Sequence, residues 1–105
     1  MIRGTTPELT FTVPFDPNTC KQIWITFSQN NKEVFTIDKT NCKLKEDSVI
    51  VRLHQSQTLQ LQPNNTVQIQ MRATFSSQTQ EEDDAVASEI VTTTVGQILR
   101  DGEIQ

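Results

Sequence analysis

Residues that could do chemistry are few and scattered in this chain of 105 residues. It has one histidine, two cysteines and no tyrosine. His54 directly follows an apolar segment, and no serine, cysteine or aspartate stands at a spacing that indicates a catalytic triad. Nucleophiles and general acids or bases are therefore scarce, and the sequence predicts a protein that is not an enzyme and uses no cofactor.

The two cysteines do not form a recognisable metal or redox motif. Cys20 and Cys42 are too far apart for a Cys-x-x-Cys pair, and no second pair exists to complete a zinc site with His54. Because no apolar leader follows Met1, we expect the chain to fold in a cytoplasm, where disulfides are rare. Both thiols are expected to be reduced and largely buried, with a disulfide between neighbouring strands as the alternative.

A run of four carboxylates, residues 81–84, is the densest group of charge in the sequence. Calcium binds six to eight oxygens, and such a run supplies several. However, it lacks the alternation and the glycine of a calcium loop. Consecutive acids are more typical of a solvated loop tip, so no metal site is predicted here.

The overall charge and hydropathy exclude two classes of partner. The net charge is −4, and the nine lysines and arginines are dispersed, so there is no basic stripe to neutralise phosphates. No apolar stretch approaches the length that crosses a bilayer. We therefore expect neither nucleic acid nor a membrane as partner, and expect other proteins instead.

The elements that position these residues are indicated by an alternation of apolar side chains with Thr, Gln and Ser. A period of two is typical of a half-buried strand. Asn30 and Asn31 separate two such segments and tolerate the positive φ of a hairpin turn. Residues 55–61 are ambiguous, because a single helical turn could replace a strand there. The expected strands cover residues 8–13, 22–29, 32–38, 42–44, 49–53, 66–75 and 87–95.

About seven short strands in a chain of this length are typical of one all-β domain. The sequence predicts an antiparallel, immunoglobulin-like β-sandwich over residues 1–105, with a polar loop at 76–84. Residues 1–7 form an N-terminal arm and residues 96–105 a C-terminal tail. Residues 97–100 could form one helical turn, with Gly102 ending it.

The candidate interaction residues are the large apolar side chains that the alternation does not place in the core. Trp24 could stack on a sugar ring or anchor an interface, although no second exposed aromatic is expected beside it. The apolar tail residues could fold back as a cap or dock on a partner chain. The full set is Trp24, Ile50, Ile98, Leu99 and Ile104.

The order of several segments resembles that of a known group of proteins. These segments are Arg3-Gly4-Thr5-Thr6 leading into 9–13, the strand 23–27, Val49-Ile50-Val51-Arg52-Leu53 with Leu59, and Ala87-Ser88-Glu89-Ile90 before a Val-rich ending. They resemble small tail-associated proteins of phages and prophages of Gram-positive bacteria. More loosely, the chain is similar to the N-terminal immunoglobulin-like domain of siphophage upper baseplate proteins, but without the long helical and receptor-binding-protein-contacting parts that follow that domain.

This resemblance implies a virion structural or adaptor protein of the tail or baseplate, made in the bacterial host cytoplasm and then built into the virion. Its partners would be other phage structural proteins or further copies of itself, as in a homo-oligomer. Edge strands rich in Thr and Gln would suit lateral strand addition. The alternative function is a carbohydrate-binding sandwich that recognises a cell-surface glycan through Trp24.

Overall fold

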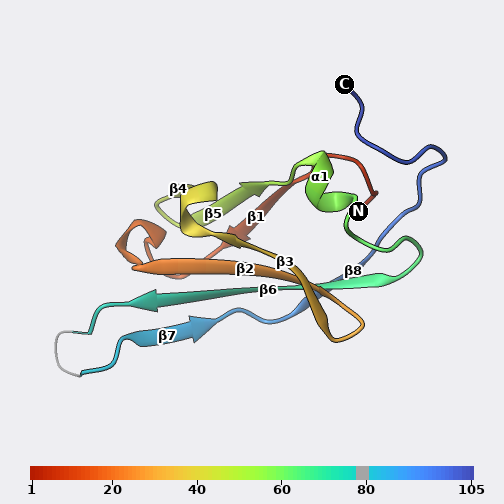
Figure 1. Cartoon of the computed structure of the whole chain (residues 1–105). Helices are drawn as coiled ribbons and strands as arrows, with labels where there is room; N and C mark the ends of the chain where they lie inside the picture. Colours follow the sequence, from red (N-terminus) through yellow and green to blue (C-terminus); the bar gives the residue numbers. More distant parts are fainter. Residues whose placement is uncertain (78–80) are drawn as a thin grey trace.

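The computed structural model describes residues 1–77 and 81–105, which form eight strands, two 3-10 turns and one short helix (Figure 1). All strand pairings are antiparallel. The elements are β1 (Glu8–Thr12), η1 (Pro17–Thr19), β2 (Gln22–Gln29), β3 (Lys32–Asp38), η2 (Lys39–Asn41), β4 (Lys43–Lys45), β5 (Ser48–Arg52), α1 (Gln55–Thr58), β6 (Thr66–Phe75), β7 (Asp84–Ala87) and β8 (Val91–Thr94).

The strands pair into two sheets that pack as a sandwich. The small sheet has the order β1-β5-β4, and the large sheet has the order β3-β2-β6, with β7 and β8 both paired to the far side of β6. This is the order of strands B-E-D and C′-C-F-G in an immunoglobulin domain. The predicted fold class, an all-β antiparallel sandwich, is therefore confirmed.

The core lies between the inner faces of the two sheets. β2 and β6 supply alternate inward residues, as the period of two predicts. Phe27 is fully buried and stacks on Phe35 of β3, with 4.5 Å between ring centroids. The buried apolar residues are Val13, Cys20, Ile23, Ile25, Phe27, Ile37, Val49, Val51, Leu53, Leu61, Val67, Ile69, Met71, Ala73 and Val95.

The hairpin between β2 and β3 forms as the sequence predicts. Asn30 and Asn31 have φ values of 53° and 63°, the left-handed conformation that tight hairpin turns require. The strand register shifts between Phe27 and Ser28, because Val34 is an extra residue on β3. As a result, Val34 and Phe35 are both only partly buried.

Two sequence-based expectations about the last third of the chain need correction. Residues 87–95 are not one strand: β7 and β8 are separate segments along β6, interrupted at residues 88–90. Ser88 fills the interruption, because its hydroxyl accepts a hydrogen bond from the Met71 N–H at 3.0 Å. Residues 97–100 do not form a helical turn. The ambiguous segment 55–61 contains the helical turn α1, and part of the predicted loop, 78–80, lies outside the described residues.

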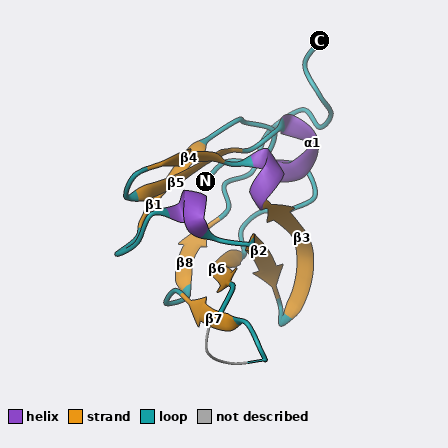
Figure 2. Cartoon of the chain, turned by 90° about the vertical axis from the view of Figure 1, so that its left-hand side faces the viewer, coloured by secondary structure: helices purple, strands orange, loops and turns teal. Residues whose placement is uncertain are grey.

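The molecule is elongated, with extents of 54 × 28 × 18 Å. Its radius of gyration is 15.2 Å, compared with about 13 Å for a compact domain of this length. The β6–β7 hairpin extends at one end of the long axis, whereas the C-terminal tail leaves the other end beyond α1 (Figures 1 and 2). The two features are therefore far apart on the same molecule.

Candidate functional site

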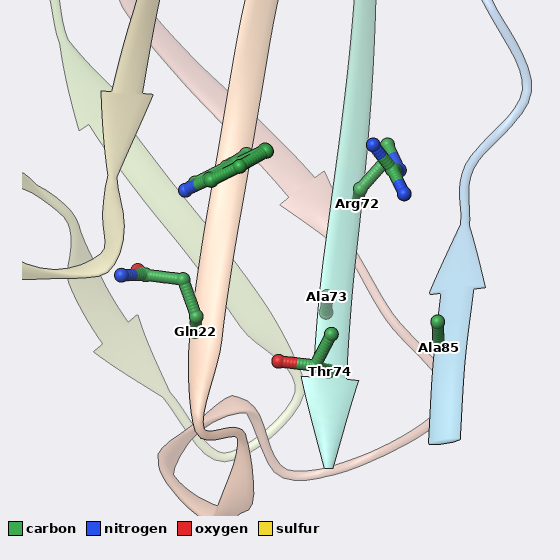
Figure 3. Close-up of a pocket in the computed structure, with 6 residues that line it drawn as sticks. Gln22, Arg72, Ala73, Thr74 and Ala85 are labelled. Atoms are coloured by element: carbon green, nitrogen blue, oxygen red, sulfur yellow. The ribbon is translucent and has the colours of Figure 1, made fainter. Parts of the chain in front are cut away.

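A shallow pocket lies on the outer face of the large sheet, around Trp24. Trp24 of β2 is directly opposite Arg72 of β6 in the register, and Arg72 is opposite Ala87 of β7. The Trp24 side chain is 50% exposed. Figure 3 shows Gln22 on β2, Arg72 and Thr74 on β6, and Ala85 on β7. The pocket has a volume of about 260 Å³ and is lined by Gln22, Trp24, Arg72, Ala73, Thr74 and Ala85.

Only part of this outer-face pocket is free to bind a ligand. The Gln22 side-chain oxygen already accepts hydrogen bonds from the N–H groups of Ile23 and Lys39, at 3.0 and 3.1 Å. The side chains of Trp24 and Arg72 make no hydrogen bond or ion pair with any residue in 1–77 or 81–105, so the indole ring and the guanidinium lie on neighbouring strands without polar partners. An exposed ring next to polar groups can stack on a planar or sugar ligand.

A second concave surface lies between the two sheets, on the side where β1 faces β7. We call it the open groove, and its volume is about 420 Å³. Phe11 of β1 is half-buried on one wall, and Val86 of β7 is 42% exposed on the other. The lining residues are Thr10, Phe11, Thr12, Val13, Pro14, Phe15, Met71, Val86, Ala87 and Ser88.

The strand edge that borders the open groove exposes side chains that face the interior. Val86 is opposite Ala73, and Val91 is opposite Ile69; both β6 partners are buried, with 2% and 5% exposure. Cross-strand neighbours point to the same face of a sheet, so Val86 and Val91 point inward. They nevertheless remain 42% and 54% exposed. The small sheet therefore does not cover this part of the large sheet.

In an immunoglobulin sandwich, one more strand precedes the equivalent of β1 and belongs to the small sheet. Among the described residues, the N-terminal arm here makes only one isolated parallel bridge, between Ile2 and Gly96. Arg3 anchors the arm, because its Nε and Nη2 donate hydrogen bonds to the carbonyls of Leu61 and Leu59 at 2.7 and 2.8 Å. The arm therefore covers the gap between the two sheets near Gly96 and leaves the gap open near β7.

On the opposite side of the sandwich, η2 carries the chain from β3 to β4 and closes the gap between the sheets. The Lys39 ammonium donates a hydrogen bond to the Cys20 carbonyl, and the Cys42 thiol donates to the Asp38 carbonyl at 3.3 Å. Cys20 and Cys42 are free thiols; Cys20 is buried, as expected, whereas Cys42 is only half-buried. Burial raises the pKa of both, that of Cys42 to about 11, with the Asp38 charge as a smaller cause.

The five predicted interaction residues are not brought together. Trp24 lies on the outer face of the large sheet, and Ile50 is half-buried on the outer face of the small sheet. In the tail, Ile98 is half-buried against the arm near Gly4, as a cap would be. Leu99 and Ile104 are 102% and 84% exposed. The tail is therefore partly cap and partly free apolar surface.

Sequence reasoning missed the open groove and its exposed residues Val86, Ile90 and Val91. Val91 and Val95 have the same parity in the predicted last strand, yet Val95 is fully buried and Val91 is 54% exposed. The alternation gives the direction of a side chain but not whether another element covers it. No pattern within a single segment signals the groove, because its walls come from β1, β6 and β7.

The remaining polar candidates, His54 and the acidic run, do not combine into a site among the described residues. His54 is exposed at the start of α1, where its backbone N–H donates to the Gln57 side chain at 2.8 Å. Asp83 of the acidic run pairs with Lys21 at 2.7 Å, and Asp84 begins β7. Within residues 1–77 and 81–105, no three His, Cys, Asp or Glu side chains group in a way that could hold a metal ion.

Comparison with known proteins gives no relative: no family model, curated protein or solved structure matches this chain. Among the residues that the structure describes, no helix is both long and apolar enough to span a membrane. The geometry of the molecule itself is therefore the basis for the functional argument.

Proposed function

We propose that this chain is a non-enzymatic structural or adaptor protein of a phage or prophage tail or baseplate, and that it acts through contacts with other proteins. The open groove is the observation that carries the proposal. Inward-facing apolar side chains beside a free strand edge are a surface that a protein strand can cover. The sequence resemblance to tail-associated proteins of Gram-positive phages supplies the biological setting.

The free edges of the sheets support this proposal. β1 pairs only with β5, and β7 and β8 pair only with β6, so within the described residues each has one unpaired side. Unpaired strand edges are the usual sites of strand addition. By contrast, β3, the other edge of the large sheet, begins with Lys32 and Glu33, and charges of this kind discourage strand addition.

Incorporation into virus particles tests this proposal. The chain would be detected by antibody in particles purified after prophage induction, and by immunoelectron microscopy on their tails. We expect Val86→Arg to reduce incorporation at least tenfold, because it places a charge in the open groove. Thr92→Arg is the matched control, since Thr92 is an exposed residue of the same edge that points to the outer face.

Two results would contradict the proposal: absence of the chain from purified particles, or equal incorporation of the Val86→Arg and Thr92→Arg variants. The genes beside the gene for this chain give an independent check. Neighbours that encode capsid, tail-tube or tape-measure proteins are expected, whereas polysaccharide-utilisation genes would count against a role in tail assembly.

Binding of a cell-surface glycan is a second candidate, and the half-exposed Trp24 ring beside Arg72 favours it. If it is correct, calorimetry with fragments of cell-wall polysaccharide will detect binding that Trp24→Ala abolishes. Ile50→Ala, on the outer face of the other sheet, should leave such binding unchanged. If no fragment binds, this second candidate is wrong.

A further inference from the structure

We propose that the open groove of one copy receives the C-terminal tail, residues 97–105, of a second copy as an added strand, so that copies join head to tail. This inference rests on the proposed function as a protein-contact module and names the partner: another copy of this chain. Three features support it: an acceptor groove, an uncovered donor segment, and their location at opposite ends of the molecule.

The groove is suited to accept an extended segment. β1 offers a free backbone edge within the described chain, so a strand beside it could form main-chain hydrogen bonds. Alternate side chains of that strand would point to the groove, where Phe11, Met71 and Val86 supply apolar surface. In strand addition of this kind, main-chain hydrogen bonds provide the affinity and side-chain contacts provide the specificity.

The tail is suited to act as the donor. On its own copy Ile98 packs against the arm near Gly4, whereas residues 99–105 are held by polar contacts: Arg3 pairs with Asp101 at 3.2 Å, and the Gln55 side chain exchanges hydrogen bonds with the Ile104 backbone at 2.8 and 3.2 Å. Leu99 and Ile104 point away from these contacts and are 102% and 84% exposed. The Asp101 side chain is 73% exposed, and Arg3, only 15% exposed, keeps its two carbonyl partners when Asp101 leaves. Residues 99–105 can therefore leave these contacts for a surface that buries their apolar side chains.

The placement of the tail points to the groove of another copy. Val86 and Gly96 lie ten residues apart on one edge of the large sheet, which corresponds to about 30 Å of strand. In the structure the tail runs away from its own groove and does not turn back along β8 and β7 (Figure 1). Figure 1 shows the tail and β7 at opposite ends of the molecule.

Charge suggests which way the tail would run. The groove ends near carboxylates: Asp47, whose carbonyl accepts from Val13 N–H at 2.9 Å, and Asp84, opposite Phe75, which packs edge-on against Phe15. The tail carries Arg100 but also Asp101 and Glu103, and a tail antiparallel to β1 would keep Glu103 away from this acidic end. Because like charges repel, the parallel orientation, which would bring Glu103 to the acidic end, is the less favourable of the two.

A contact between two different surfaces is heterologous, and repeated copies then close into a ring or extend as a filament. This arrangement makes a specific prediction for mixtures of two defective variants. Val86→Arg blocks the groove and leaves the tail intact. The double variant Leu99→Asp, Ile104→Asp blocks the tail and leaves the groove intact. Each variant alone should be monomeric, and an equimolar mixture should form dimers that grow no further.

Sedimentation velocity and light scattering over a range of concentrations measure these states. We expect the wild-type chain to form larger species as concentration rises, and Val86→Arg to weaken this association at least tenfold, about 1.4 kcal/mol. Thr92→Arg, the matched control, should associate like the wild type. If Val86→Arg fails to fold, a synthetic peptide of residues 97–105 serves instead, because it should occupy the groove and reduce the size of wild-type assemblies.

The inference is overturned if the wild-type chain stays monomeric, if the mixture does not form dimers, or if Thr92→Arg weakens association as much as Val86→Arg. Its failure is distinct from failure of the proposed function. A monomeric chain that still enters virus particles through Val86 would keep the function and remove the self-association. A chain that associates head to tail but is absent from particles would keep the self-association and remove the proposed function.

Discussion

The two sides of the sandwich differ in how the gap between the sheets is covered. Ile37 on β3 and Val91 on β8 are both inward-facing residues of edge strands in the large sheet, yet Ile37 is 3% exposed and Val91 is 54% exposed. The difference lies in the connections. On the closed side η2 carries the chain from β3 to β4, whereas on the open side the arm bridges only as far as Gly96. A strand's own pattern therefore does not decide whether its inner face is buried.

The largest expected effect comes from truncating the equivalent inward residue on each side. Ile37→Ala should lower the free energy of unfolding by about 2–5 kcal/mol, because it leaves a cavity in the core. Val91→Ala should lower it by less than about 1 kcal/mol, because Val91 is already in contact with water. Urea unfolding followed by circular dichroism measures both. Equal losses would mean that the open side is covered in solution.

A smaller effect is expected at the one point where the chain closes the open side. Arg3→Ala should lower the free energy of unfolding by about 2 kcal/mol, because two carbonyls lose a charged donor. The amide of Gly96, which donates to the Met1 carbonyl, should then exchange its hydrogen faster. Arg3→Lys keeps the charge but loses the planar fork and should recover only part of the stability. Unchanged exchange at Gly96 would show that Arg3 does not anchor the arm.

The smallest expected effect is a pH dependence on the closed side. The pKa of the Cys42 thiol is raised from 9.0 to about 11 in the folded protein, so the folded state holds this proton more tightly than the unfolded chain does. The stabilisation is fully present below pH 9 and is lost as pH rises toward 11. Unfolding measured at pH 8 and at pH 10.5 should show this loss in the wild type and a smaller one in Cys42→Ala. Equal pH dependence of the unfolding free energy in the two proteins would contradict the raised pKa of Cys42.

The sequence predicted well wherever local pattern decides the outcome. The bounds of β2, β3 and β6 follow directly from their alternation, and the turn at Asn30 and Asn31 from the tolerance of asparagine for positive φ. The outward position of Trp24 followed from the same parity. These features depend on neighbours within a few residues, and such interactions can be read from one segment at a time.

The open groove could not be predicted, because it depends on which strands become edges and on what fails to cover them. The groove is lined by three segments that are distant in the sequence, and they contain Phe11, Met71 and Val86. Each of these segments has an ordinary strand alternation. The break at Ser88 was missed for a related reason. A serine hydroxyl can replace a backbone hydrogen-bonding group only when a partner amide, here that of Met71, is brought beside it by the fold.

The Ser88 interruption also bears on how the protein avoids aggregation. Without it, β7 and β8 would join into one long edge strand, rich in Val, Ile and Thr, whose only interior charge is Glu89. Such an edge is a template for amyloid-like stacking. By breaking that edge into two four-residue pieces, Ser88 limits uncontrolled stacking at high concentration and leaves β1 as the longer unpaired edge beside the open groove.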